Sequence, residues 1–222
     1  MAVGFAPILV IVNDRAADRL VWVDCEMTGL DPTIDELVEV AVVVTGPDLK
    51  ELDEGLTVVI KPSEAALANM NDFVTGMHRD SGLLTEIPSG VDLATAQEQV
   101  FAYISSHVPV PRKAPLAGSS VYVDRGFLSR YMPRVDEHLH YRVVDVSSFK
   151  ELIRRWYPRV YFAAPEKRGN HRALADVRES IAELRYYRQA VMVETPGPDT
   201  DAARLIATEH VVDHGGEGGS GH

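Results

Sequence analysis

Apolar residues recur with two different periods along the chain, and these periods predict strands and helices. The run Leu20 to Val23 is short, apolar and followed by polar residues, which is typical of a strand. Residues 38–44 are rich in valine, and residues 56–60 form a further apolar run before the break at Lys61-Pro62. Because only short turns separate these runs, we expect three strands in an antiparallel meander.

Two longer segments show helical periodicity instead. In the first, Asp92 is placed to act as the N-cap of a helix, and the second lies before Pro196, which cannot continue a helix. Each segment places its apolar residues on one helical face. The two stripes are Ala96, Val100, Phe101 and Ile104 in the first segment and Leu174, Val177, Ile181, Leu184 and Tyr187 in the second.

Strands and helices alternate between these two segments. Residues 115–118 and 143–146 are predicted strands, and residues 123–131 form a predicted helix. Ser148 and Glu151 have the spacing of a capping box that would open a further helix through Trp156. The order of elements predicts one α/β domain with a mixed β-sheet flanked by helices.

The two ends of the chain differ from this domain. We expect an N-terminal extension at residues 1–18, the folded domain at 19–195 and a flexible C-terminal tail at 196–222, where Asp213 to His222 is rich in glycine. The apolar run Phe5 to Val12 is too short to span a bilayer, so we expect no membrane association.

Charge and cysteine content narrow the class of function. The net charge of −11 argues against broad electrostatic capture of long nucleic acid, so any such substrate should be small or gripped locally. Cys25 is the single cysteine, which excludes an intramolecular disulfide and a thiolate-rich zinc site and suits a cytoplasmic protein.

Asp24 and Glu26 lie two residues apart at the end of the first predicted strand. Strand alternation points both side chains to one face and Cys25 to the other. Neighbouring carboxylates raise each other's pKa unless a cation neutralises them, which indicates a site for a hard divalent ion such as Mg²⁺ or Mn²⁺. The alternative is a pair of solvated loop acids.

Three further residues are candidates from their position alone. Asp124 begins a helical stretch, where it could serve only as a helix-start acid. His171 precedes Asp176 by five residues, about 140° on a helix, so the two cannot share a face of one continuous helix. They can converge if His171 lies in the loop before the helix, although a histidine there could also be a surface residue.

Four segments in this order resemble the oligoribonuclease family of DEDDh-type 3′-to-5′ exoribonucleases. They are VWVDCEMTGLD, GSSVYVDRGFLSRYMP, HYRVVDVSSFKELIRRWYP and GNHRALADVRES, and the likeness extends from about Leu20 to Tyr187. The resemblance implies a ribonuclease-H-like exonuclease fold, a homodimer, and hydrolysis of short RNA, especially diribonucleotides, to 5′-mononucleotides.

The resemblance also implies roles for individual residues. Two metal ions would be held by four acids, with His171 as general base. Leu30 would wedge between the bases and Phe73 would stack on one of them. The remaining substrate contacts would cap the 5′ phosphate, with the tyrosine lent by the second subunit. The metal ligands are Asp24, Glu26, Asp124 and Asp176, and the cap residues are His78, Ser120, Tyr141, Arg142 and Ser147.

The sequence departs from the family pattern at two positions, and two other functions are possible. Phe73 stands where the family often has tryptophan, and Ser119 where asparagine is common, so affinity for the base is in question. Leu30, Phe73 and Tyr141 could also be ordinary packing residues. A deoxyribonuclease of the same superfamily would share the acids, and residues 140–142 with Leu30 favour RNA. A non-catalytic nucleotide-binding scaffold is disfavoured because all five catalytic positions are filled.

Overall fold

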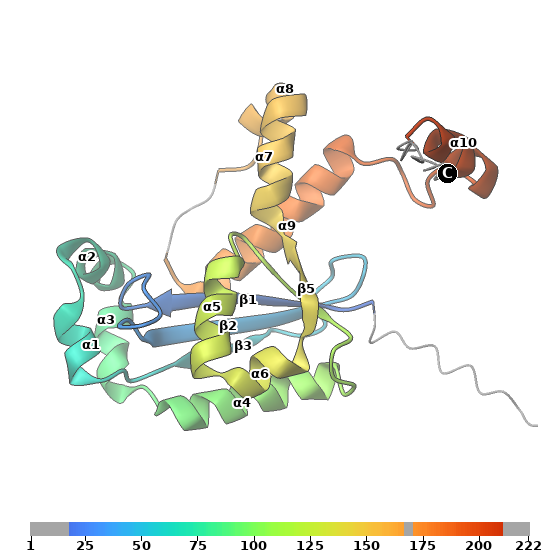
Figure 1. Ribbon diagram of the computed structural model, residues 1–222. Helices are drawn as coiled ribbons and strands as arrows, with labels where there is room; N and C mark the ends of the chain where they lie inside the picture. The colour runs from blue at the N-terminus through green and yellow to red at the C-terminus, as the bar shows by residue number, and fades with distance from the viewer. Residues whose placement is uncertain (1–17, 167–170, 211–222) are drawn as a thin grey trace, which may run out of the picture.

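The computed structural model describes residues 18–166 and 171–210. Five strands form one mixed sheet in the order β3-β2-β1-β4-β5, with helices on both faces (Figure 1). The strands are β1 (Leu20–Met27), β2 (Leu37–Thr45), β3 (Leu56–Val59), β4 (Pro115–Gly118) and β5 (His140–Asp145). The helices are α1 (Glu64–Asn69), α2 (Asp72–Asp80), α3 (Leu83–Glu86), the 3₁₀ turn η1 (Ile87–Ser89), α4 (Leu93–His107), α5 (Tyr122–Tyr131), α6 (Pro133–His138), α7 (Val146–Trp156), α8 (Pro158–Phe162), α9 (Ala173–Val191) and α10 (Thr200–Thr208).

The first three strands form the predicted antiparallel meander, with β2 between β1 and β3. On its other side β1 pairs in parallel with β4, which pairs in parallel with β5, so the prediction of a mixed sheet is confirmed. Every residue of β2 is buried, as expected of a valine-rich strand with neighbours on both sides and helices on both faces.

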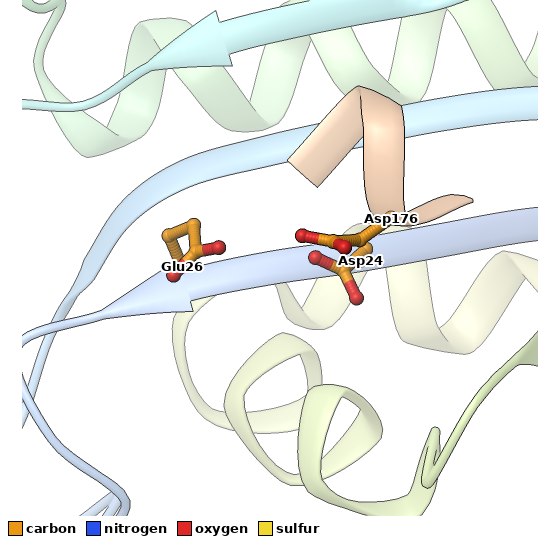
Figure 2. Close-up of side chains that lie close together, drawn as sticks. All are labelled: Asp24, Glu26 and Asp176. Carbon is orange, nitrogen blue, oxygen red and sulfur yellow. The ribbon is translucent and has the colours of Figure 1, made fainter. Parts of the chain in front are cut away.

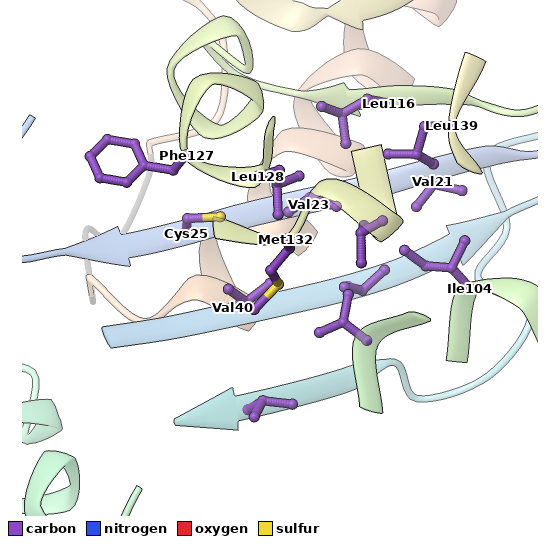
Figure 3. Packing of buried hydrophobic residues seen from close by; sticks show 14 of the residues in the cluster. Val21, Val23, Cys25, Val40, Ile104, Leu116, Phe127, Leu128, Met132 and Leu139 are labelled. Atoms are coloured by element: carbon purple, nitrogen blue, oxygen red, sulfur yellow. The ribbon is translucent and has the colours of Figure 1, made fainter. Parts of the chain in front are cut away.

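Strand alternation divides the core into two layers. Val21, Val23 and Cys25 of β1 face the layer that contains α4, α5 and α6 (Figure 3). In α4 the predicted stripe packs into this layer through Ala96, Val100 and Ile104, with Phe101 partly buried beside them, and Asp92 caps the helix. Trp22, which points the other way, belongs to the layer under α9.

Helix α9 crosses the second face of the sheet and extends beyond it (Figure 1). Its buried residues include Val177, Ile181, Leu184 and Tyr187, and Leu174 packs partly buried beside them, which confirms the predicted stripe. Since α9 packs on β1 and β2, its first turn lies over the strand that carries Asp24 and Glu26.

The capping box predicted at Ser148 and Glu151 is wrong. Helix α7 already begins at Val146, and Asp145 caps it by accepting a hydrogen bond from the Ser147 amide over 2.9 Å. The predicted strand at 143–146 is correspondingly one residue too long at its end. Asp145 is the last residue of β5, and its side chain starts the helix directly.

Several short helices were not predicted, because their four to nine residues carry little periodicity. Helices α1 and α2 start at side-chain caps, Ser63 and Asn71, and α1 to α3 cover one end of the sheet. Helix α10 lies within the segment expected to be a flexible tail. The remainder of that segment, from 211, and residues 1–17 of the expected extension lie outside the described residues. No helix in the described ranges is long and apolar enough to cross a membrane.

Candidate active site

Asp24 and Glu26 occupy the same face of β1, as predicted. Cys25 between them is buried in the opposite layer, against residues of α5. Glu26 is buried and Asp24 is half-buried, so neither is a solvated loop acid. Because side chains alternate in direction along β1, both carboxylates lie in one partly closed site.

Asp176, in the first turn of α9, brings a third carboxylate to this face. One oxygen from each of Asp24, Glu26 and Asp176 lies within 4.8 Å of the others, a spacing at which a single cation can contact all three (Figure 2). The helix contributes its acid here because α9 starts directly above the β1 end, so residues distant in sequence converge.

Asp124 approaches from α5. Its carboxylate oxygen Oδ1 accepts a hydrogen bond of 2.8 Å from the backbone amide of Cys25, between the two β1 acids. This amide is free to bond a side chain because β4 pairs with β1 only at Val21 and Trp22. Asp124 is buried, and its charge acts on Asp24, so it is more than a helix-start acid.

The four acids share one electrostatic environment. Burial, together with the charges of Asp124, Asp176 and Glu26, raises the pKa of Asp24 well above its ordinary value. Burial is also the main reason that the pKa of Glu26 rises to about 8 and that of Asp124 to about 7. A divalent cation would relieve this repulsion, and an all-carboxylate ligand set suits hard cations rather than zinc. The residues present therefore fit a divalent metal site.

His171 lies outside the helix, immediately before α9, as predicted. It is exposed and has a positive φ of 46°. Burial lowers the pKa of His78, and the charge of His171 adds to this lowering, which places His171 near the end of β1. The rest of its predicted loop, residues 167–170, is outside the described part of the chain, and its role as a base stays a prediction.

Leu30 and Phe73 line one cavity beside the acids. The cavity has a volume of about 460 Å³, and its walls also include Glu26, Met27 and Met77. Both residues are largely exposed, 76% for Leu30 and 78% for Phe73, so they are not packing residues within the described chain. An apolar cavity next to carboxylates suits the flat faces of nucleobases.

The loop that carries Leu30 is held by Asp35. The Asp35 carboxylate accepts hydrogen bonds from the Thr28 hydroxyl over 3.1 Å and from the Asp31 amide over 3.0 Å. Gly29 packs so closely on this carboxylate that a Cβ atom would lie 2.3 Å from Asp35 Oδ2. The side chain of Leu30 is therefore presented on a braced loop.

The structure brings together only part of the predicted phosphate cap. The hydroxyls of Ser120 and Ser147 lie 3.1 Å apart, and Asp145 Oδ1 accepts hydrogen bonds from both of their backbone amides over 2.9 Å. On the adjoining β5 the Arg142 side chain donates a hydrogen bond to the hydroxyl of Tyr141 over 3.1 Å, and both residues are exposed. These four residues present polar groups at the end of β4 and along β5.

His78, the fifth predicted cap residue, makes different contacts in the described structure. It is fully buried, donates a hydrogen bond from Nε2 to the Met27 carbonyl over 2.8 Å, and has Nδ1 3.9 Å from Glu26. No hydrogen bond or ion pair in the described structure joins it to the cap residues. Its position in α2 fits a role at the cavity end of the site, because α2 also carries Phe73 and Met77.

A charged pair next to the acids was not predicted. Glu39 is fully buried in β2 and lies opposite Glu26 in the strand register. Arg172 contacts it over 2.7 Å. The signal was present in the sequence, because Glu39 is a charged residue inside the apolar run 38–44, and such a residue needs a partner.

Comparisons with known proteins identify the family of the chain. A family model described as exonuclease matches residues 21–184. A curated oligoribonuclease of Streptomyces coelicolor is 61% identical over 198 residues, which covers 89% of this chain and 99% of that protein. One from Leifsonia xyli is 62% identical over 192 residues, covering 86% of this chain and 93% of the relative.

A solved structure shows the same fold. A complex of E. coli exonuclease I with single-stranded DNA and zinc superposes with a TM-score of 0.62 at 14% identity. The match covers 78% of this chain and 40% of the exonuclease chain. The sheet and helices therefore form the ribonuclease-H-like exonuclease fold, and the chain belongs to the oligoribonuclease family.

Proposed function

We propose that the protein is a metal-dependent 3′-to-5′ exoribonuclease that hydrolyses short oligoribonucleotides, dinucleotides above all, to 5′-mononucleotides. The observation that carries this proposal is the position of the acids between two different binding features. An apolar cavity lies beyond Glu26 at one end, and the Ser120–Ser147 pair lies at the other, where β4 leaves β1. From Trp22 to Glu26 the strand rises about 13 Å, which suits a substrate of few nucleotides.

The chain's own residues divide the chemistry between them. Asp24, Glu26, Asp124 and Asp176 would hold two Mg²⁺ or Mn²⁺ ions, which when bound lower the pKa of water and neutralise charge at phosphorus. His171 would take the proton of the attacking water, since imidazole is the side chain that most often serves as a general base. Its position before α9, on the side of the site that holds Asp176, supports this role.

The remaining contacts would select the substrate. Leu30 and Phe73 would contact the bases. His78, from the same helix as Phe73, would support the cavity end of the site through its buried hydrogen bond to the Met27 carbonyl. Ser120, Ser147 and Arg142 would hold the 5′ phosphate with the partner subunit's Tyr141. A longer strand would have to pass through the space occupied by these groups. A protein with a net charge of −11 also gives little electrostatic attraction to the phosphates of a long RNA.

A homodimer is supported by the surface around β5. This strand is at the edge of the sheet, and together with α7 and α8 it exposes a set of large apolar side chains. Exposed apolar patches next to a free strand edge mark interaction surfaces, and a second copy of the chain is the simplest partner. The residues are Tyr141, Val143, Leu152, Trp156, Tyr157 and Phe162. The single cysteine, which is buried, suits the cytoplasm that we propose as the location.

The deciding experiment compares end-labelled RNAs from dinucleotides to about ten nucleotides, with Mg²⁺ and with a chelator. We expect metal-dependent release of 5′-mononucleotides, fastest for the dinucleotide. Faster degradation of the longest RNA would contradict the closed site. A DNA dinucleotide cleaved equally well would favour a deoxyribonuclease, and metal binding without turnover on any substrate would favour a non-catalytic scaffold.

A further inference from the structure

A fifth carboxylate lies beside the four proposed metal ligands. Glu39 is fully buried on β2 and pairs in register with Glu26 of β1. Both of its oxygens are already engaged. Oε1 accepts from the Arg172 guanidinium over 2.7 Å, and Oε2 accepts from the Ala173 amide over 2.9 Å. Because both oxygens of Glu39 accept hydrogen bonds from protein groups, we do not count Glu39 among the metal ligands.

Arg172 connects three segments of the chain through this carboxylate. It is the N-cap residue of α9, it pairs with Glu39 on β2, and it pairs with Glu86 at the end of α3 over 2.8 Å. A second bond of 3.0 Å from Nη2 to Glu86 makes this contact two-pronged. We call Glu39, Arg172 and Glu86 the Arg172 clamp.

The clamp lies between the two proposed active-site residues of this segment. His171 precedes Arg172 directly, and Asp176 follows one helical turn later, with its amide donating to the Arg172 carbonyl over 3.1 Å. The positive φ of 46° at His171 is unfavourable for a residue with a Cβ atom, and such a conformation persists only where surrounding contacts enforce it. The two-sided pairing of Arg172 supplies contacts of this kind.

We propose that the Arg172 clamp is a positioning device that sets both His171 and the start of α9, and with it Asp176, relative to the β1 acids. The part concerning His171 rests on the proposed function, whereas the part concerning Asp176 requires only a metal site. A buried ion pair is weak evidence for stability, since its desolvation offsets much of its attraction, but it can specify one geometry. Here that geometry places the start of α9 over the end of β1.

The test uses Arg172→Gln and Arg172→Lys in the full-length chain. Arg178→Gln is the matched control, because Arg178 lies on the same helix and forms a 3.2 Å ion pair with Glu51, which is neither a proposed metal ligand nor a clamp residue. Mn²⁺ affinity by calorimetry, kcat and KM on an RNA dinucleotide, and thermal unfolding are measured for each. A fourth variant, Glu39→Gln, keeps the shape of the buried partner while removing its charge.

For Arg172→Gln we expect Mn²⁺ affinity to fall about tenfold or more and kcat to fall about 10- to 100-fold while KM changes little. Arg172→Lys should recover part of both, Glu39→Gln should behave like Arg172→Gln, and Arg178→Gln should match the wild type. In a His171→Ala background the Arg172→Gln change should lower kcat by a smaller factor than in the wild type, because the base that it positions is already gone.

A folded Arg172→Gln protein with wild-type Mn²⁺ affinity and kcat, changed only in its melting temperature, would overturn the proposal. Failure of the proposed function has a different signature. In that case the wild type would not cleave the dinucleotide, yet the comparison of Mn²⁺ affinity between Arg172→Gln and Arg178→Gln would still decide whether the clamp positions Asp176. If Arg172→Gln does not fold, the same comparison is made with Arg172→Lys.

Discussion

The backbone amide of Cys25 donates a hydrogen bond to the side chain of Asp124, and this contact joins the acid of α5 to the strand that carries two others. It exists because β4 separates from β1 after Trp22 and leaves the next part of the strand edge open. The carboxylate that occupies this edge is held at a distance set by main-chain geometry. The four acids thus come from three elements yet meet at one strand end.

Loss of the proposed base and loss of a proposed ligand should differ in their effects. We expect His171→Ala to lower kcat about 10²- to 10⁴-fold while Mn²⁺ affinity stays near the wild-type value. Asp124→Asn should lower both, because it removes an anionic ligand and leaves the fold in place. Steady-state kinetics and calorimetry measure the two quantities. Near-normal turnover by folded, metal-loaded His171→Ala would remove His171 from the mechanism.

The metal-free protein should lose stability as pH rises. The pKa of Glu26 is raised from 4.5 to about 8, so between these values the folded state binds more protons than the unfolded chain. The contribution of Glu26 to stability then decreases with pH across this window, and stabilisation by Mg²⁺ increases, since metal binds the deprotonated acids. Thermal unfolding with chelator and with Mg²⁺ measures both trends.

Glu26→Gln provides the control for this pH effect, because it removes the titrating group without changing its size. In chelator, the wild type should become less stable relative to Glu26→Gln as pH is raised through the window. A wild type that gained stability relative to the variant would contradict the assignment. The sign follows from burial of an acid, and screening by salt does not reverse it.

The size of the aromatic ring at position 73 should set affinity for the base. We expect Phe73→Ala to raise KM for an RNA dinucleotide about 5- to 100-fold, the range of one lost stacking contact, with kcat little changed. Phe73→Trp should lower KM, since a larger ring buries more of the base. Leu205→Ala, on exposed α10, is the control for loss of a surface apolar residue. Unchanged KM in both Phe73 variants would exclude stacking at this position.

Complementation between inactive subunits should reveal where Tyr141 acts. If Tyr141 serves the partner subunit's site, co-expressed Tyr141→Ala and Asp124→Asn chains should form mixed dimers with one complete site. Random pairing then restores on the order of a quarter of wild-type activity. Arg142→Ala combined with Asp124→Asn is the matched control, because Arg142 is proposed to act within its own subunit and should not be rescued. Equal rescue by both pairs, or by neither, would contradict the assignment in trans.

Local sequence was sufficient for the regular parts of the fold. The valine-rich run of β2, the stripe of α4 and the stripe of α9 were all predicted. A regular spacing of apolar residues over a long segment fits only one kind of element. The N-cap of α7 was misplaced by three residues, since Asp145 and Ser148 can both cap a helix and only the end of β5 selects between them. The short helices α1 to α3 carry too few turns for a period to appear.

Within the active site, the sequence by itself determined that Asp24 and Glu26 share a face, because alternation is a property of any strand. The family resemblance predicted that Asp124, His171 and Asp176 belong to the same site. Only the tertiary structure decided how they meet: Asp124 through an open strand edge, and Asp176 through a helix start held by Arg172 and Glu39. It also placed His78 in a buried hydrogen bond with the Met27 carbonyl. These contacts join residues up to 134 positions apart, and no local pattern encodes such a distance.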